Sequence, residues 1–182
     1  MQIVTFDGNE QLKHQMAQLL VEAFHEHWAD AWETFEDGLK EVEEMCEAER
    51  ICLVAIEDEK LLGMIGGIPE YDGKVWELHP LAVQPGLQGK GIGRALVMEF
   101  EEQVRQRGGL TIMLGSDDQN EMTSLAMVDL YENLWDKVKN IQNFKGHPYE
   151  FYQKMDYVIT GVVPDANGLG KPDIMMSKRV AS

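Results

Sequence analysis

The sequence predicts an α+β fold, in which a mixed, mostly antiparallel and twisted sheet is flanked by helices. Two apolar runs around a short polar turn indicate a β-hairpin, and two segments near the N-terminus repeat apolar residues at helical spacing. In the middle of the chain a strand, a glycine-rich loop, a helix and another strand follow one another, which is a βαβ-like unit. A chain of 182 residues is expected to form one domain, residues 1–182.

The first third of the chain predicts two helices and three strands. Asn9 is a suitable N-cap for a helix that runs through Phe24, and a shorter amphipathic helix follows over 35–48. Residues 51–57 and 61–71 form the hairpin, and a third strand follows over 75–83. Glu77 and His79 interrupt this apolar third strand. Pro80 cannot donate to a sheet ladder, so we expect a bulge or a break in pairing there.

The rest of the chain predicts the central unit and a C-terminal part. A helix with Ile92, Leu96, Phe100 and Val104 inward ends at Gly108 and Gly109, and a strand follows over 110–116. An apolar stripe predicts a helix over 129–141. We expect a short helix over 147–155 and strands near 157–163 and 174–180.

The composition excludes several classes of function. The chain carries 32 acidic and 16 basic side chains, a formal charge of -16, and residues 1–60 hold 16 of the acidic but 4 of the basic ones. This field repels nucleic acid and anionic lipid but attracts a soluble cation. No window is long and apolar enough to span a bilayer, and the N-terminus lacks a signal-peptide pattern, so we expect a cytoplasmic protein without membrane or nucleic-acid partners.

Cysteine and histidine usage predicts neither a disulfide framework nor a metal site. Cys46 and Cys52 are expected to be free thiols. The pair His25 and His27 lacks further residues that would complete a coordination shell, so no metal is expected.

The most informative segment is the glycine-rich loop where the third strand passes into a helix. It reads Gln88-Gly89-Lys90-Gly91-Ile92-Gly93-Arg94, and its glycines let backbone N–H groups approach a pyrophosphate at a helix N-terminus. The spacing fits neither a Walker A loop nor a dinucleotide-binding G-x-G-x-x-G motif. Gln88, Gly91 and Gly93 match the Q/R-x-x-G-x-G/A signature, and the chain resembles the GNAT family of N-acetyltransferases along nearly its whole length.

A closer resemblance is distributed over more than half of the chain. The strings WELHPL (76–81), RGGLTIMLGSDD (107–118), DLYE (129–132), HPYEFY (147–152) and the tail PDANG followed by KPDI resemble the aminoglycoside 6'-N-acetyltransferase branch. The resemblance implies acetyl transfer from acetyl-CoA to the 6'-amine of an aminoglycoside antibiotic, hence resistance, by a homodimer. Relatives in this branch carry a degenerate phosphate loop, whereas this chain keeps the glycines of the broad family.

The chemistry needs a base, because an alkyl amine is mostly protonated at neutral pH. Glu77 is the candidate, acting directly or through water, since it precedes the loop and the resemblance places the base there; the alternative is an electrostatic anchor. His79 is a candidate proton relay or a structural histidine. The resemblance assigns Tyr152 as the acid for the CoA thiolate, with Tyr149 and Tyr157 less favoured and a core role as the alternative. Direct attack is preferred over a covalent route through either cysteine.

Binding residues follow from the same reasoning. The resemblance implies that the backbone of Leu81, Ala82 and Val83 binds the pantetheine arm of coenzyme A, and that residues 88–94 bind its pyrophosphate. A cationic acceptor is best held by carboxylates and aromatic rings. The candidates for this role in the acidic first third are Trp28, Asp30, Trp32 and Glu33, and the resemblance adds Asp117 and Glu132.

Two other functions remain open at this stage. The first keeps the fold and acetyl-CoA but uses a polyamine or a basic protein or peptide amine as the acceptor. The second is a catalytically idle CoA-binding module, which the presence of Glu77, Tyr152 and the loop glycines disfavours.

Overall fold

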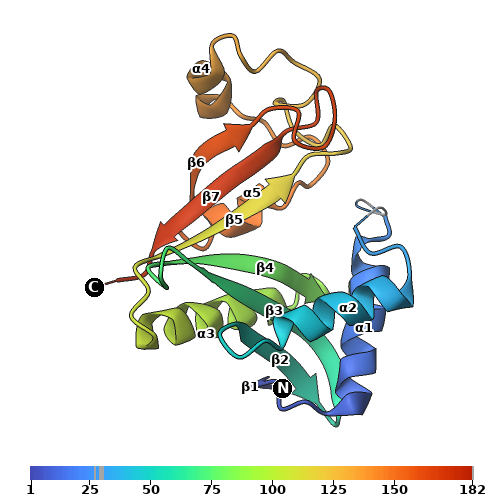
Figure 1. Cartoon of the computed structure of the whole chain (residues 1–182). Helices are drawn as coiled ribbons and strands as arrows, with labels where there is room; N and C mark the ends of the chain where they lie inside the picture. The colour runs from blue at the N-terminus through green and yellow to red at the C-terminus, as the bar shows by residue number, and fades with distance from the viewer. Residues whose placement is uncertain (27, 29–30, 182) are drawn as a thin grey trace. The chain divides into compact units, whose positions relative to one another are not determined.

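The computed structural model describes residues 1–26, 28 and 31–181. Figure 1 shows the elements in chain order. They are β1 (Gln2–Thr5), α1 (Glu10–Phe24), α2 (Phe35–Met45), β2 (Ile51–Glu57), β3 (Lys60–Glu70), β4 (Val75–Val83), the 3-10 turn η1 (Pro85–Leu87), α3 (Ile92–Gln106), β5 (Thr111–Asp117), α4 (Leu134–Lys139), α5 (Tyr149–Gln153), β6 (Val158–Val163) and β7 (Asp173–Arg179).

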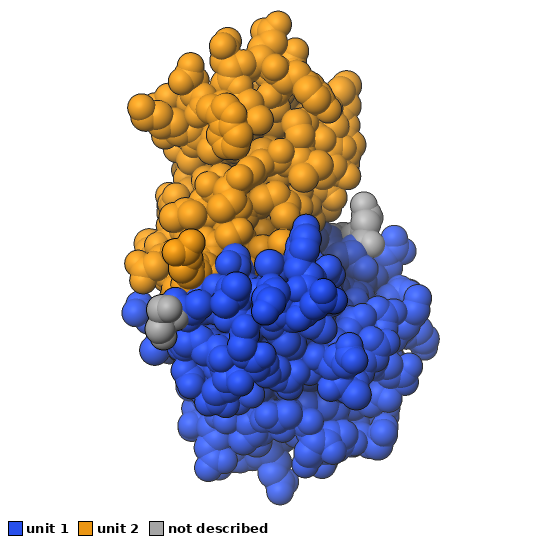
Figure 2. All heavy atoms as spheres, turned by 60° about the vertical axis from the view of Figure 1, so that its left-hand side comes forward, with its two compact units in different colours: residues 1–112, 180–182 blue, residues 113–179 orange. Residues whose placement is uncertain are grey.

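The strands follow the order β1-β2-β3-β4-β5-β7-β6 in one sheet. The chain divides into two compact units, residues 1–112 with 180–182 and residues 113–179 (Figure 2). In the first unit β1 to β4 pair antiparallel in sequence order, and in the second β6 and β7 form an antiparallel pair. The predicted α+β class with a mostly antiparallel sheet is therefore confirmed.

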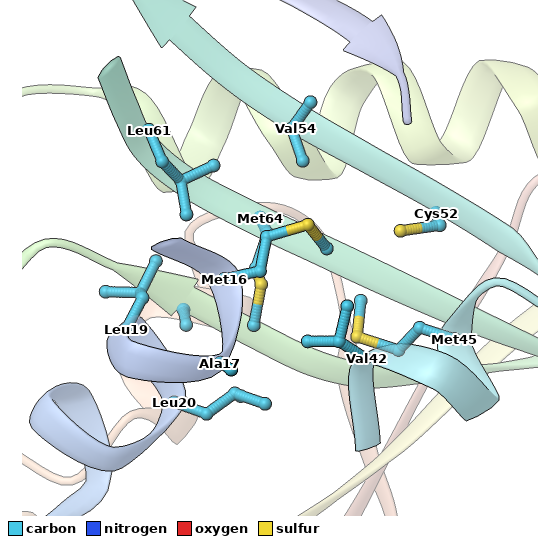
Figure 3. Close-up of a cluster of buried hydrophobic side chains, with 11 residues drawn as sticks. Met16, Ala17, Leu19, Leu20, Val42, Met45, Cys52, Val54, Leu61 and Met64 are labelled. Carbon is cyan, nitrogen blue, oxygen red and sulfur yellow. The ribbon is translucent and has the colours of Figure 1, made fainter. Parts of the chain in front are cut away.

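Helices α1 and α2 cover one face of the first unit's sheet, and α3 covers the other. Met64 of β3 packs in a cluster with residues of α1 and α2, whereas a Cβ at Gly67 would lie 2.2 Å from the Phe100 ring of α3 (Figures 1 and 3). Gly38 of α2 allows this helix to approach α1 closely, since a Cβ at Gly38 would lie 2.6 Å from the Ala17 carbonyl oxygen. Because neighbouring residues of β3 face opposite sides, each face has its own apolar layer.

The predicted irregularity at Pro80 is a bulge in β4. Ile65 lies opposite Leu81 and Gly67 opposite Leu78, so His79 and Pro80 together oppose Gly66. Two residues facing one is the definition of a β-bulge, and it reverses the side-chain alternation beyond it. Gly66 is suited to this position because a Cβ there would lie 2.3 Å from the His79 carbonyl oxygen.

Capping explains where the first two helices begin. The Asn9 side chain accepts a hydrogen bond from the Leu12 N–H at 3.0 Å, as expected. Thr34 and Asp37 form a reciprocal capping box at the start of α2, which ends at Met45 rather than at the expected residue 48. The α3 prediction is confirmed, with its four expected apolar residues buried.

The expected helix over 129–141 is wrong, because only Leu134–Lys139 is helical. The Asp129 carboxylate accepts from the Tyr131 N–H at 2.9 Å, a local turn that competes with a helix, and Asn133 has a φ of 52°. Strand β1 was not expected, since four mostly exposed residues give no alternating pattern. No helix within the described part of the chain is long and apolar enough to cross a membrane.

Candidate active site

Glu77 and His79 lie on the face of the sheet that α1 and α2 cover. Glu77 is opposite Ile68, which shares a face with Met64 by alternation along β3, and opposite residues of an antiparallel pair lie on the same face. The predicted shared side is therefore confirmed. Both side chains are half-buried, between buried neighbours on β4.

His79 contacts α2 and the segment that joins α1 to α2. Its Nε2 lies 3.7 Å from Oε1 of Glu41 on α2, and its ring lies 5.9 Å from the Trp32 ring, centroid to centroid. The Glu41 carboxylate is mostly shielded, with 16% of its side chain exposed. A shielded carboxylate and an indole ring are thus the neighbours of the His79 imidazole.

An open acidic pocket lies beside this contact. It has a volume of about 450 Å³ and carries four carboxylates and one ammonium group. Its lining residues are Ala31, Trp32, Glu33, Asp37, Lys40, Glu41 and Glu44. The excess of negative charge beside an indole ring fits a ligand with several ammonium groups.

The acidic pocket includes some of the residues expected to bind the acceptor. Glu33 and Trp32 line it, whereas Trp28 packs edge-on against Phe24 with ring centroids 5.9 Å apart. Asp30 and His27 lie outside the residues that the structure describes. Glu41 was not expected as a site residue, because nothing in the sequence separates an outward carboxylate on a helix from a solvated one.

The loop between β4 and α3 has the conformation that the glycines predict. Gly89 and Gly91 have φ angles of 73° and 87°, in the left-handed region that side chains disfavour. Gly91 is the N-cap of α3 and provides no side chain to bind the first N–H groups of the helix. Those N–H groups are thus left for an anion at the positive end of the helix dipole.

The remaining residues expected to bind coenzyme A surround this loop. The Lys90 ammonium donates to the Gly86 carbonyl oxygen at 3.2 Å, and Gln88 and Arg94 are exposed, while Ile92 is buried in the helix packing and Gly93 is half-buried. Leu81 and Val83 are half-buried and Ala82 is buried, at the end of β4 that leads into the loop. Backbone donors and two cations at one helix start fit a pyrophosphate, so the residues present suit coenzyme A.

Comparison with known proteins assigns the family. The profile of the Acetyltransferase (GNAT) family matches residues 14–134, about two thirds of the sequence. The chain belongs to the GNAT acetyltransferase family. This assignment covers α1 to α3 and β2 to β5, which include the loop and the acidic pocket.

Solved structures resemble this GNAT chain over nearly its full length. An aminoglycoside 6'-N-acetyltransferase complexed with coenzyme A is 46% identical with a TM-score of 0.91, and the match covers 99% of this chain and 97% of that one. The aminoglycoside 6'-N-acetyltransferase from Enterococcus faecium is 45% identical with a TM-score of 0.89 at the same coverage.

A curated relative matches a smaller part. The mycothiol acetyltransferase of Beutenbergia cavernae is 30% identical over 117 residues, which are 64% of this chain. The match spans only 39% of that relative's own length. One of the similar solved structures described above holds coenzyme A.

Tyr152 is a buried residue of the second unit. It lies on α5 with 8% of its surface exposed, and its ring packs edge-on against Phe151 and Tyr157 at centroid distances of 5.0 and 5.7 Å. Burial raises the pKa of Tyr152 well above that of an ordinary phenol, so the hydroxyl keeps its proton. Tyr149 and Tyr157 are also buried.

His147 connects α5 to the end of β5 and was not expected as a site residue. Its Nε2 donates to the Asp117 carbonyl oxygen at 3.2 Å, and its Nδ1 accepts from the Tyr149 N–H at 3.2 Å, which fixes one neutral tautomer. The ring is 1% exposed, and burial lowers the pKa of His147. The only sequence signal was its place beside Pro148 at the start of a short helix.

Asp117 and Glu132 belong to the second unit. The Asp117 carboxylate accepts a hydrogen bond from the side-chain amide of Asn167 at the end of β5. Glu132 is exposed just before α4, and its carbonyl oxygen accepts from the Lys137 ammonium. Asp117 is the last residue of β5, and Glu132 lies in the loop before α4, where contacts to a substrate are common.

Proposed function

We propose that this chain transfers the acetyl group of acetyl-CoA to the 6'-amine of aminoglycoside antibiotics by direct attack, and thereby confers resistance. The observation that carries the proposal is 45–46% identity, over 97% of their lengths, to two aminoglycoside 6'-N-acetyltransferases. The acidic pocket supports it, because its carboxylates suit a ligand with several ammonium groups.

Bound acetyl-CoA supplies the thioester that carries the transferred acetyl group. The loop of Gln88 to Arg94 and the start of α3 would hold its pyrophosphate, and the backbone of Leu81, Ala82 and Val83 would hold its pantetheine arm. Glycine suits position 91 for two physical reasons. The φ of 87° at Gly91 disfavours a side chain, and a residue without a side chain leaves the first N–H groups of α3 uncapped for the pyrophosphate.

Glu77 removes a proton from the acceptor ammonium, directly or through water, because the neutral amine is the nucleophile. His79 relays that proton toward Glu41, whose carboxylate is 3.7 Å from its Nε2. Tyr152 donates its hydroxyl proton to the sulfur of the leaving thiolate, for which a protonated phenol is required.

The acceptor is held by carboxylates and an aromatic ring. Glu33 contributes a carboxylate from the acidic pocket, and in the preceding segment Asp30 contributes a carboxylate and Trp28 an aromatic ring. Asp117 and Glu132 provide further carboxylates for the other ammonium groups of the antibiotic. The enzyme acts in the cytoplasm.

The enzyme is a homodimer in this proposal. Large apolar side chains of the second unit are exposed, among them Tyr131 at 76%, Trp135 at 65% and Leu169 at 88%. Exposed aromatic and aliphatic residues of this size are typical of protein interfaces. Sedimentation equilibrium of the full chain tests the dimer, and a single monomeric species at micromolar concentration would contradict it.

The deciding experiment is a thiol-release assay with acetyl-CoA and a panel of amines. Rapid release of CoA is expected with kanamycin and tobramycin, and none with paromomycin, which carries a 6'-hydroxyl group. Release with spermidine or a basic peptide alone would contradict the antibiotic as substrate and favour the other acceptor class. Tight CoA binding without release from any acceptor would contradict an enzymatic role.

A further inference from the structure

His147 is held in place by hydrogen bonds from all of its polar groups. Its Nε2 donates to the Asp117 carbonyl oxygen, and its Nδ1 accepts from the Tyr149 N–H, both at 3.2 Å. The Asn143 side chain holds its backbone, since the amide oxygen accepts from the His147 N–H at 2.7 Å and the amide nitrogen donates to the His147 carbonyl oxygen at 2.9 Å. With both ring nitrogens and both backbone groups paired, the imidazole has one defined orientation.

These hydrogen bonds belong to a closed path that starts and ends at β5. The Asp118 carboxylate, which is fully buried just after β5, accepts from the N–H and the hydroxyl of Thr123, both at 2.8 Å. Thr123 forms an antiparallel bridge with Asn143. Asn143 binds His147, and His147 returns to the Asp117 carbonyl oxygen. The path therefore holds His147 at a fixed place relative to the end of β5.

Helix α5 takes its direction from this anchor. Five residues are too few for a helix that is stable by itself, because the first turn costs more conformational entropy than its hydrogen bonds offset. Tyr149, the first residue of α5, binds the imidazole and lies against it, with 5.7 Å between the ring centroids. Tyr152 follows on the same short helix. The orientation of the Tyr152 side chain is therefore set at His147.

We propose that His147 is a positioning residue for the acetyl transfer, which holds α5 so that the Tyr152 hydroxyl keeps the orientation in which it protonates the leaving thiolate. Orientation matters because a general acid acts only within hydrogen-bond reach of the atom that it protonates. The imidazole itself takes no proton in the reaction, since the Tyr149 N–H occupies its Nδ1. The inference rests on the proposed function and on the role of Tyr152 in it.

His147→Gln removes one of the two ring contacts. Its side-chain amide can still donate to the Asp117 carbonyl oxygen, but no acceptor remains at the place of Nδ1 for the Tyr149 N–H. We expect kcat to fall by up to about tenfold, which is the loss expected in Tyr152→Phe, with unchanged KM for tobramycin and acetyl-CoA. His147→Asn keeps an acceptor near that place, so its kcat should lie closer to the wild-type value.

A double-mutant cycle distinguishes positioning from a general loss of stability. His147→Gln combined with Tyr152→Phe should be no slower than Tyr152→Phe alone, because no hydroxyl is left to position. A general structural defect would instead lower kcat by the same factor in both backgrounds. His25→Gln, at an exposed position, is the matched control and should have wild-type kcat. If His147→Gln does not fold, Asn143→Ala, which loosens His147 but keeps its ring, takes its place in the cycle with the same expectation.

Thiol release from acetyl-CoA with tobramycin measures every protein in the cycle, and calorimetric CoA binding gives the folded fraction. Equal losses in the two backgrounds would overturn the inference and leave the proposed function in place. Wild-type kcat in folded His147→Gln, or in Tyr152→Phe, would also overturn it. No release by the wild type with any aminoglycoside would contradict the proposed function, and the inference would fall with it.

Discussion

At the scale of single residues, Glu77 is the proposed base for the acceptor amine. We predict that Glu77→Gln lowers kcat by roughly 10²- to 10⁴-fold, because an amide keeps the shape but takes no proton. The dissociation constant for CoA, measured by calorimetry, should stay unchanged. Glu59→Gln in the β2–β3 turn is the control, and it should have wild-type kcat. Wild-type turnover in Glu77→Gln would show that Glu77 is not the base.

The role of the Tyr152 hydroxyl can be tested by a substitution that removes only its oxygen atom. Tyr152→Phe keeps the ring packing against Phe151 and Tyr157 but removes the proton donor. We predict a fall in kcat on the order of tenfold, modest because a thiolate with a pKa near 8.5 leaves without much help. Tyr131→Phe, at an exposed position, controls for loss of a phenol. A thermal midpoint equal to wild type with unchanged kcat would exclude Tyr152 as the acid.

At the scale of elements, Gly66 and Gly67 of β3 determine how β4 and α3 are placed. We predict that Gly67→Ala destabilises the protein by about 1–3 kcal/mol, because the new methyl group would overlap the Phe100 ring, whose residue is fully buried. Urea unfolding measures this. Gly86→Ala, where a Cβ meets nothing within 4 Å, should change stability little. Equal stability of the two variants would contradict the close α3–β3 packing.

His147 makes the stability of the second unit depend on pH. Burial lowers the pKa of His147, so the unfolded chain takes up the proton first as the pH falls. Its contribution to stability is therefore complete above the ordinary histidine pKa of about 6.5 and is lost as the pH falls below it. Thermal unfolding at pH 7.5 and 5.5 measures this loss. The loss of stability between pH 7.5 and 5.5 should be smaller in His147→Asn than in the exposed control His25→Asn. Equal losses in the two variants would show that His147 does not cause the pH dependence.

The elements also show what the sequence could and could not predict. Helices α1 and α3 were predicted with nearly correct ends, because their signals are local: a buried stripe in both, the Asn9 cap before α1, and Gly108 and Gly109 after α3. The helix expected over 129–141 failed because the Asp129 carboxylate and the Lys137 ammonium bind nearby backbone groups instead. Contacts between distant segments, such as His79 with Glu41, left no local pattern.

At the scale of the whole molecule, the formal charge of -16 should affect the two substrates in opposite ways. An aminoglycoside is a polycation and is attracted, whereas acetyl-CoA is an anion and is repelled except at its loop. Salt screens such interactions, with a Debye length of about 10 Å at 0.1 M. The acidic first sixty residues include the acidic pocket, so we expect the attraction to be strongest there.

We therefore predict that raising NaCl from 20 to 300 mM increases KM for tobramycin by about tenfold or more, in the range of steering effects. KM for acetyl-CoA should not rise, because screening reduces its repulsion. Glu33→Gln with Asp37→Asn, at the pocket, should weaken the salt dependence for tobramycin; Glu102→Gln with Glu121→Gln, outside its lining, should not. If salt raised both KM values equally, a general effect of ions on the enzyme would explain the data, and the acidic pocket would not be the acceptor's electrostatic site.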